Sequence, residues 1–223
     1  MSDLVCELVG VGKGYDGRAV IHDIDLAVQA GEMVAISGKS GSGKSTLLNI
    51  IGLLETADRG EVRLFGERSP RVGSAKATRL LRSRLGYLFQ NFALIDGASV
   101  DDNLRIAQTY TKGSRSERRA ARTSALDAVG LSGSGGQKVY KLSGGEQQRV
   151  AIARLMLKPC DVVLADEPTG SLDATNSDVV LTLLRALNAR GKTMIVVTHD
   201  DRVAAACHRT IALPDPRSAL EPA

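Results

Sequence analysis

Three short apolar runs, none interrupted by a polar residue, constrain the fold of this 223-residue chain more than any other feature. They are Met33–Ile36, Val162–Ala165 and Met194–Val197. Continuous rather than alternating apolar character is typical of strands buried on both faces, as in a parallel sheet covered by helices. Each run leads into a polar turn, and ligands bind where the carboxyl ends of such strands meet. The sequence therefore predicts an α/β fold with the three turns at one edge.

The turn after the first run fits the phosphate-binding pattern G-x-x-x-x-G-K-[ST] and reads Gly38-Lys39-Ser40-Gly41-Ser42-Gly43-Lys44-Ser45. Glycines let the backbone approach an anion, and the start of the next helix adds positive potential. In this pattern Lys44 reaches the β- and γ-phosphates, and the Ser45 hydroxyl binds Mg²⁺. A chance glycine-serine loop would not need a buried strand before it, so we interpret the segment as a phosphate loop.

The second run ends in two adjacent carboxylates, Asp166 and Glu167. Consecutive side chains at a strand end point to opposite faces, so the two can take different roles. Asp166 suits a ligand of Mg²⁺, and Glu167 suits a group that polarises an attacking water. Taken alone, two such acids are more often a helix cap or a solvated turn. The phosphate loop in the same chain favours the catalytic interpretation.

A second glycine-rich helix start is Ser143-Gly144-Gly145-Glu146. A capping box would explain the serine and the glutamate, because each satisfies a backbone N–H group near the other. It would not explain two glycines in the first turn, since each weakens a helix by roughly 1 kcal/mol relative to alanine. We interpret the glycines as leaving backbone N–H groups open to an anion.

Apolar spacing and helix-ending residues predict helices over 178–190, 143–158 and 114–129. The polar, arginine-rich stretch from about 66 to 142 is interpreted as a helical insertion into the α/β core. The first 30 residues predict antiparallel strands that flank this core.

Composition excludes several classes of protein. No apolar run approaches the roughly 20 residues that span a bilayer, and the first residues lack the pattern of a signal peptide. Three scattered cysteines argue against a disulfide framework or a zinc site. The net charge of +4 is compatible with ATP, nucleic acid or an anionic membrane face and does not choose among them.

The segment Leu142–Gln147 resembles the signature of ABC ATPases, and it precedes the acidic turn by the interval usual in that family. The remaining family elements occur in order. Tyr15 matches the aromatic residue that stacks on adenine, and Gln90 matches the glutamine that senses Mg²⁺ and couples to the membrane subunit. Ser171-Leu172-Asp173 matches the D-loop, and His199 matches the switch histidine that contacts the γ-phosphate.

The resemblance implies a single ABC ATPase domain over 1–213, with a flexible tail over 214–223. The implied fold is α/β: a P-loop NTPase core with a mostly parallel sheet, an N-terminal antiparallel β subdomain, and a helical subdomain inserted at about 91–158.

It also implies ATP and Mg²⁺ as cofactors. Binding of ATP would involve Tyr15 and the loop residues Gly38, Lys39, Ser40, Gly41, Ser42, Gly43, Lys44, Ser45 and Thr46. Ser45, Gln90 and Asp166 would hold the metal, and Glu167 and His199 would be catalytic. In this family two copies associate head to tail. The residues that would complete the site of the second copy are Ser143, Gly144, Gly145, Glu146 and Asp173.

The implied partners are a second copy of the chain and an integral-membrane permease, with the chain peripheral on the cytoplasmic, inner face of the cell membrane. Two arginine clusters could instead indicate nucleic acid: Arg79, Arg82 and Arg84, and Arg115, Arg118, Arg119 and Arg122. Few aromatic residues accompany them, so we interpret them as solvated helix faces, with lipid headgroups or the membrane subunit as the next alternative. No nucleic-acid partner is expected. His22 and His208 are interpreted as structural or surface residues.

The sequence of Leu164–Asp173 resembles that of the ABC ATPase branch that serves lipoprotein release, macrolide export and cell division. Asn91–Ile95 and Lys138–Tyr140 resemble bacteriocin-export ATPases. Cys207-His208-Arg209 departs from the family pattern, which has an aspartate before the arginine. Two functions stay open: an ATPase that energises export of a peptide, antibiotic or lipid-linked substrate, and a mechanical-signalling ATPase of the cell-division type.

Overall fold

A five-stranded parallel sheet forms the centre of the molecule. The computed structural model describes residues 4–214. The strand order is β6-β7-β8-β3-β9, and every neighbouring pair is parallel. The strands are β3 (Met33–Ser37), β6 (Leu85–Leu88), β7 (Val162–Asp166), β8 (Thr193–Val197) and β9 (Arg209–Ala212). The three apolar runs form the adjacent strands β7, β8 and β3, which confirms the predicted fold class.

Both faces of the parallel sheet are buried. Along β3, Val34 and Ile36 belong to one hydrophobic cluster, whereas Met33 belongs to the other. The same alternation occurs in β7 and β8, where Val163 and Val196 belong to the same cluster as Met33. The sheet therefore lies between two hydrophobic cores and contributes side chains to both. This explains why its strands contain uninterrupted apolar runs.

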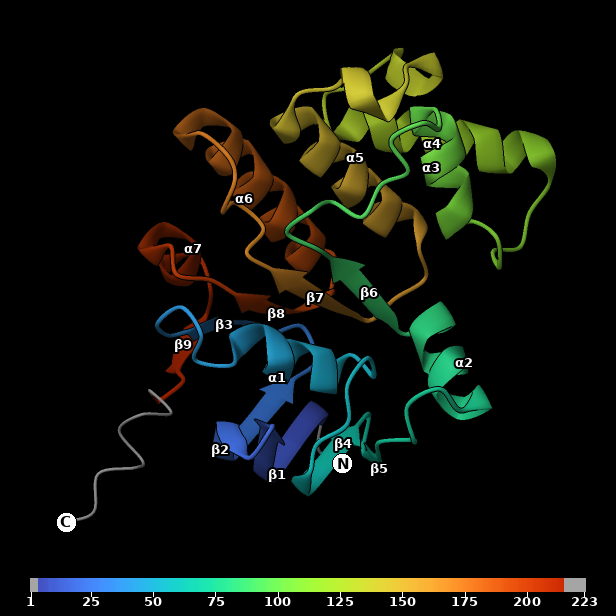
Figure 1. Ribbon diagram of the computed structural model, residues 1–223. Coiled ribbons are helices and arrows are strands. Elements are labelled where there is room, and N and C mark those ends of the chain that lie inside the picture. Colours follow the sequence, from blue (N-terminus) through green and yellow to red (C-terminus); the bar gives the residue numbers. More distant parts are fainter. Residues whose placement is uncertain (1–3, 215–223) are drawn as a thin grey trace.

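An antiparallel sheet lies on one side of the parallel sheet. Its strand order is β2-β1-β4-β5, with β1 (Leu4–Tyr15), β2 (Arg18–Gln29), β4 (Arg59–Leu64) and β5 (Glu67–Arg68). Helix α1 (Lys44–Ile51) lies between the two sheets (Figure 1), and its buried leucines and isoleucines pack into the same cluster as the inner faces of both sheets. The prediction of antiparallel strands in the first 30 residues is confirmed.

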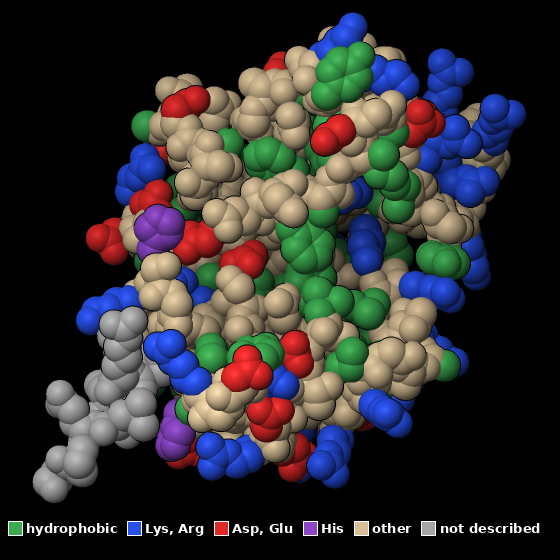
Figure 2. Space-filling model, in the orientation of Figure 1, with side chains coloured by type: hydrophobic (Ala, Val, Ile, Leu, Met, Phe, Trp, Pro, Cys, Tyr) green, Lys and Arg blue, Asp and Glu red, His purple; other side chains and the backbone are tan. Residues whose placement is uncertain are grey.

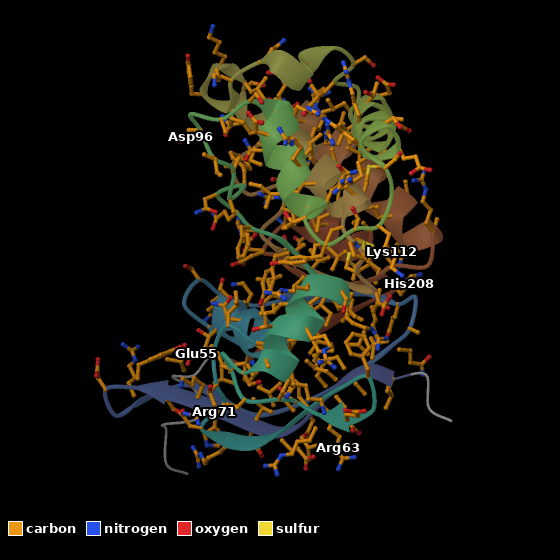
Figure 3. The ribbon with its side chains drawn as sticks, turned by 90° about the vertical axis from the view of Figure 1, so that its right-hand side faces the viewer. Glu55, Arg63, Arg71, Asp96, Lys112 and His208 are labelled. Carbon is orange, nitrogen blue, oxygen red and sulfur yellow. The ribbon has the colours of Figure 1, made fainter. Side chains whose placement is uncertain are left out.

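The other helices lie mainly on the opposite face of the parallel sheet (Figure 1). They are α3 (Val100–Ala107), α4 (Arg115–Ala128), α5 (Gly144–Leu157) and α6 (Ala174–Ala189), with short 3₁₀ turns η1 (Ser134–Gly136) and η2 (Val139–Lys141). Figure 3 shows this division from the side: Glu55, Arg63 and Arg71 lie with the antiparallel sheet, and Asp96 and Lys112 lie with these helices. Helix α2 (Ala75–Ser83) lies beside β6, and α7 (Asp201–Ala205) lies near β3.

The predicted helix starts have a clear physical basis. Capping boxes formed by Ser114 with Glu117 and by Ser143 with Glu146 precede α4 and α5, as expected from the sequence. Helix α6 starts earlier than predicted, at Ala174 instead of residue 178. The Asp173 side chain accepts a hydrogen bond from the Asn176 N–H group (2.8 Å), which fixes this earlier start.

One interpretation of the sequence is wrong in part. The stretch from about 66 to 142 is not a helical insertion throughout, because it contains β5 of the antiparallel sheet and β6 of the parallel sheet. Strand β6 has only four residues and includes Gly86, so its strand signal is weak. Gly86 lets β6 pack closely against α5, since a Cβ there would come within 2.8 Å of Leu155 Cδ2.

The unusual Cys207-His208-Arg209 segment forms the junction between α7 and β9. The His208 N–H group donates to the Met33 carbonyl oxygen, and the Met33 N–H group donates to His208 Nδ1, both at 2.8 Å. The histidine thus ties the junction to β3, in agreement with a structural role. The expected tail over 214–223 lies outside the described residues apart from Pro214. Within residues 4–214, no helix is long and apolar enough to cross a membrane.

Candidate functional site

A cavity of about 630 Å³ opens at the carboxyl edge of the parallel sheet. The phosphate loop after β3 contributes most of its lining. Gln90 after β6, Glu167 after β7 and His199 after β8 complete it together with Val20 of β2. Residues from four separate strand ends therefore meet at one place, as the three polar turns predicted. Val20 carries no sequence signal of a site, because a valine in a strand is ordinary.

The loop can follow its path only because of its glycines. Gly43 has a left-handed φ of 88°, and a Cβ there would come within 2.8 Å of the Val20 carbonyl oxygen. A side chain at this position would push the loop away from β2. Helix α1 begins directly after Gly43 without a side-chain cap, so the first N–H groups of the helix are left for another acceptor.

Lys44 stabilises the shape of the loop from inside. Its side chain is buried, with 8% exposed, and its ammonium group donates to the carbonyl oxygens of Gly38 (2.8 Å) and Lys39 (2.9 Å). The Ser42 hydroxyl oxygen is also buried and has no hydrogen-bond partner within residues 4–214. The loop thus places the positive charge of Lys44 at the cavity, which suits an anionic ligand.

Ser45 and Asp166 meet across the sheet edge. The Ser45 hydroxyl donates to Asp166 Oδ1 at 3.0 Å. Burial raises the pKa of Asp166; the Ser45 hydrogen bond lowers it, the charge of Glu167 raises it, and the charge of Lys44 lowers it. Gln90 lines the same cavity as Ser45. A hydroxyl, a carboxylate and an amide are the oxygen ligands that Mg²⁺ prefers, so these residues fit the expected metal.

Glu167 and His199 contact each other. Glu167 Oε1 lies 2.8 Å from His199 Nδ1, and the His199 N–H group donates to Oε2 at 3.4 Å. The Glu167 side chain is only 13% exposed, whereas the histidine is 67% exposed. Glu167 also has a positive φ of 45°, which is unusual for a residue with a side chain. The backbone is thus held in an unfavourable conformation that directs this carboxylate to the cavity.

Tyr15 does not line the cavity. It lies at the end of β1, with 45% of its surface exposed, and its hydroxyl donates to Glu55 at 3.3 Å. The Lys13 ammonium lies 5.3 Å from the centre of its ring. One face of the ring is therefore next to a cation, and the residue stays accessible.

The five residues expected to act on a second copy also lie outside the cavity. Ser143 and Glu146 hydrogen-bond to each other at the start of α5, and Asp173 caps α6. The two helix starts touch: a Cβ on Gly145 would overlap the Asn176 amide, whereas one on Gly144 would meet only ordinary contacts. At Gly145 the missing side chain therefore has a packing reason in addition to the predicted one.

Sequence reasoning missed Arg154 of α5. Its guanidinium donates to the carbonyl oxygens of Phe92 (3.0 Å) and Ala93 in the segment after Gln90. Both of these residues have positive φ, 62° and 48°. The arginine therefore stabilises a strained segment beside the cavity. An arginine on a helix more than 60 residues away gives no sequence signal of this contact.

Three arginines of the two clusters make specific contacts. Arg84 lies over the Phe65 ring at 3.6 Å and pairs with Asp161, and Arg82 lies over the Tyr110 ring at 4.3 Å. Arg122 forms an ion pair with Asp101 at 2.6 Å. The prediction of a solvated helix face is therefore wrong for Arg122, whose side chain is only 12% exposed, whereas Arg82 stays exposed and Arg84 partly exposed.

Comparison with known proteins decides the family. The family model described as ABC transporter matches residues 21–170, which is more than half of the chain. The chain belongs to the ABC transporter family. This ABC protein resembles the macrolide export ATP-binding/permease protein MacB of Escherichia coli, with 43% identity over 94% of the chain and 33% of MacB. The pyoverdine export ATP-binding/permease protein PvdT of Pseudomonas syringae pv. tomato is 41% identical over 94% of the chain and 33% of PvdT.

The ABC fold is also seen in solved structures. The dimeric structure of MJ0796, described as a bacterial ABC transporter cassette, superimposes with a TM-score of 0.86, 37% identity and 95% coverage of both chains. A second MJ0796 dimer, in a post-hydrolysis state bound to ADP and Pi, has a TM-score of 0.86, 36% identity and the same coverage. The expected ABC ATPase fold and class are confirmed. The chain spans about a third of the length of the curated relatives it matches.

Proposed function

We propose that this ABC cassette binds MgATP in the 630 Å³ cavity and hydrolyses it to drive export through a membrane permease. The observation that carries the proposal is the meeting of the phosphate loop with Gln90, Glu167 and His199 in that cavity. MacB and PvdT, which are named as export ATP-binding/permease proteins, support the direction of transport.

The loop from Gly38 to Thr46 holds the phosphates. Its glycines let backbone N–H groups approach the anion, and Lys44 exchanges its bonds to loop carbonyls for bonds to phosphate oxygens. Tyr15 stacks on the adenine; its exposed ring at the end of β1 supports this role. Ser45, Gln90 and Asp166 hold Mg²⁺, which neutralises phosphate charge when it is bound.

Glu167 is the group that polarises the attacking water. Its buried carboxylate lies at the cavity, and a carboxylate there accepts a hydrogen bond from water and orients it toward the terminal phosphorus. His199 holds Glu167 through the 2.8 Å contact and contacts the γ-phosphate. The products are ADP and inorganic phosphate.

A second copy completes the site head to tail. Ser143, Gly144, Gly145, Glu146 and Asp173 lie outside the chain's own cavity, so in a dimer they are available to the nucleotide of the partner. The dimeric MJ0796 structures support this arrangement. ATP then stabilises the dimer, and hydrolysis releases it.

The partner is an integral-membrane permease, and the cassette is peripheral on the cytoplasmic face of the cell membrane. Residues 1–213 act as one ABC ATPase domain, with the helical subdomain inserted at about 91–158. Figure 2 shows hydrophobic side chains along the boundary between the two halves of the molecule, which suits a protein partner.

The finer assignment is a bacteriocin-export type. The two segments whose sequences support it, Asn91–Ile95 and Lys138–Tyr140, lie near each other: the Tyr140 N–H group donates to the carbonyl oxygen of Asp96, the residue after Ile95 (3.3 Å). Ile95 and Tyr140 are both exposed, so both are available to the permease.

Replacement of Glu167 by glutamine tests the proposal. The variant should bind MgATP yet hydrolyse it at least 100-fold more slowly, because the amide polarises water poorly. It should therefore accumulate as an ATP-bound dimer on size-exclusion chromatography. The Glu61→Gln variant removes an exposed carboxylate from β4 and should behave as wild type. Wild-type turnover by the Glu167→Gln variant would contradict the proposed role.

A further inference from the structure

A second hollow lies on the helical side of the molecule. It has a volume of about 990 Å³ and shares no lining residue with the nucleotide cavity. Helix α3 and helix α4 form its walls, and the glycine-rich segment around η1 closes it. We call this hollow the α3–α4 groove.

The floor of the α3–α4 groove is a network of hydrogen-bonded polar side chains. Arg122 donates to both carboxylate oxygens of Asp101 (2.6 and 3.1 Å) and to the Gln108 side-chain oxygen (2.9 Å). The Gln108 amide, which is buried, donates to the Arg118 carbonyl oxygen at 3.1 Å. These bonds join α3 to α4, and they leave the groove with fixed walls.

Three further arginines of the groove have no such partner. Within residues 4–214, the guanidinium groups of Arg115, Arg118 and Arg119 make no ion pair and no hydrogen bond. The lining contains five arginines and two aspartates, a net charge of +3. In Figure 2, Lys and Arg side chains gather over α4 at the upper right, and in Figure 3 nitrogen-tipped side chains crowd between α3 and α4.

We propose that the α3–α4 groove binds an extended, acidic peptide segment of a partner protein. Arg115 and either Arg118 or Arg119 lie about one helical turn, or roughly 5.4 Å, apart along α4. Alternate residues of an extended peptide lie about 6.6 Å apart on the same side. Carboxylates at alternate positions therefore have nearly the spacing of these guanidinium groups, each of which can donate two hydrogen bonds to one carboxylate.

The shape and lining of the groove favour a peptide over other polyanions. A bilayer surface meets protruding basic residues better than residues that face into a hollow, whereas a peptide chain can enter. Nucleic-acid grooves combine basic residues with aromatic side chains on which bases stack, and no aromatic residue lines this one. Ile106, which is apolar and exposed, lies in the lining and suits the stem of a peptide side chain.

Fluorescence anisotropy with a labelled nine-residue peptide of alternating glutamate and serine tests the proposal. The wild-type chain should bind it, and a peptide with glutamine in place of glutamate should not bind. The Arg115→Gln/Arg118→Gln/Arg119→Gln variant should bind about tenfold more weakly, because exposed ion pairs contribute little singly. Higher salt should weaken wild-type binding.

The matched control replaces three exposed arginines outside the groove by glutamine: Arg71, Arg79 and Arg185. This variant has the same net charge as the first and should bind the peptide as wild type does. Both variants should keep wild-type ATP hydrolysis, which reports that they are folded. Equal weakening in both variants, or no binding by wild type, would overturn the proposal. So would binding to phosphatidylglycerol vesicles that requires Arg115, Arg118 and Arg119 when the peptide does not bind.

Discussion

At the scale of single residues, Glu32 and Arg209 link the two sheets. The Arg209 guanidinium pairs with Glu32 before β3 and donates to the Ala27 carbonyl oxygen in β2. The hydrogen bond between Arg209 and Glu32 lowers the pKa of Glu32 and raises the pKa of Arg209. The folded chain therefore favours the ionised carboxylate more than the unfolded chain does.

We expect Glu32→Gln to lower the free energy of unfolding by about 0.5–1 kcal/mol at pH 7, since the pair is partly exposed. A lowered folded-state pKa stabilises the fold above the unfolded pKa, and the effect is lost as the pH falls through the folded value. The difference from wild type should therefore shrink below about pH 4. Urea unfolding at pH 7 and pH 3.5 measures it. Arg209→Gln should show at least this loss at pH 7, because its bond to the Ala27 carbonyl oxygen is lost as well; a Glu32→Gln difference that is undiminished at pH 3.5 would rule out the ion pair as its cause.

Most of the predicted site residues could be found from the sequence because short local patterns identify them. Lys44 and Ser45 occupy fixed positions in a short pattern, and Asp166 and Glu167 end a recognisable strand. The contact between Arg154 and the segment after Gln90 could not be predicted, since it joins side chain to backbone across the chain. The overlap that a side chain on Gly145 would make with Asn176 could not be predicted for the same reason.

At the scale of elements, the start of α5 offers two adjacent glycines with different environments. A Cβ on Gly145 would overlap the Asn176 amide, whereas a Cβ on Gly144 would lie 3.8 Å from Phe92. Alanine gains up to about 1 kcal/mol of helix propensity at either position. Overpacking costs about 1–3 kcal/mol. We therefore expect Gly145→Ala to destabilise the fold by about 1 kcal/mol and Gly144→Ala to be neutral or slightly stabilising.

Thermal unfolding of the two variants measures this difference. Adding Asn176→Ala to Gly145→Ala should restore part of the lost stability, because the overlapping amide is then removed. Equal melting temperatures for the two single variants would show that the α5–α6 contact tolerates a side chain.

The elements that could be predicted share a strong, regular signal. Strands β3, β7 and β8 are buried on both faces, so five successive positions carry almost only apolar residues. Edge strands β6 and β9 have four residues each; β6 includes Gly86 and β9 is mostly exposed, so neither has a strong strand signal. Their place in the sheet is set by neighbours that lie far away in the chain, β7 and β3.

At the scale of the whole molecule, the proposed head-to-tail dimer predicts complementation between two inactive variants. Lys44→Ala removes the loop lysine, and Ser143→Arg blocks the start of α5. A heterodimer of the two has one site in which an intact Lys44 faces an intact Ser143. Random pairing makes half of the dimers heterodimers, so about a quarter of the wild-type sites should return.

Steady-state ATP hydrolysis of the separate variants and of their mixture measures this recovery. The control is a double variant that carries both changes in one chain. This variant should stay inactive, because none of its dimers contains an intact site. If the mixture is no more active than its components, each chain must form its site alone.

The order of the strands also decides whether the molecule can be divided. The parallel sheet runs β6-β7-β8-β3-β9, so a cut in the connection between α3 and α4 leaves β3 and β6 in the first fragment. All their parallel neighbours, β7, β8 and β9, are in the second. The first fragment would hold no pair of adjacent parallel strands. The phosphate loop would then acquire its shape only after the two halves assemble, which makes this connection a natural position for a split-protein reporter of association.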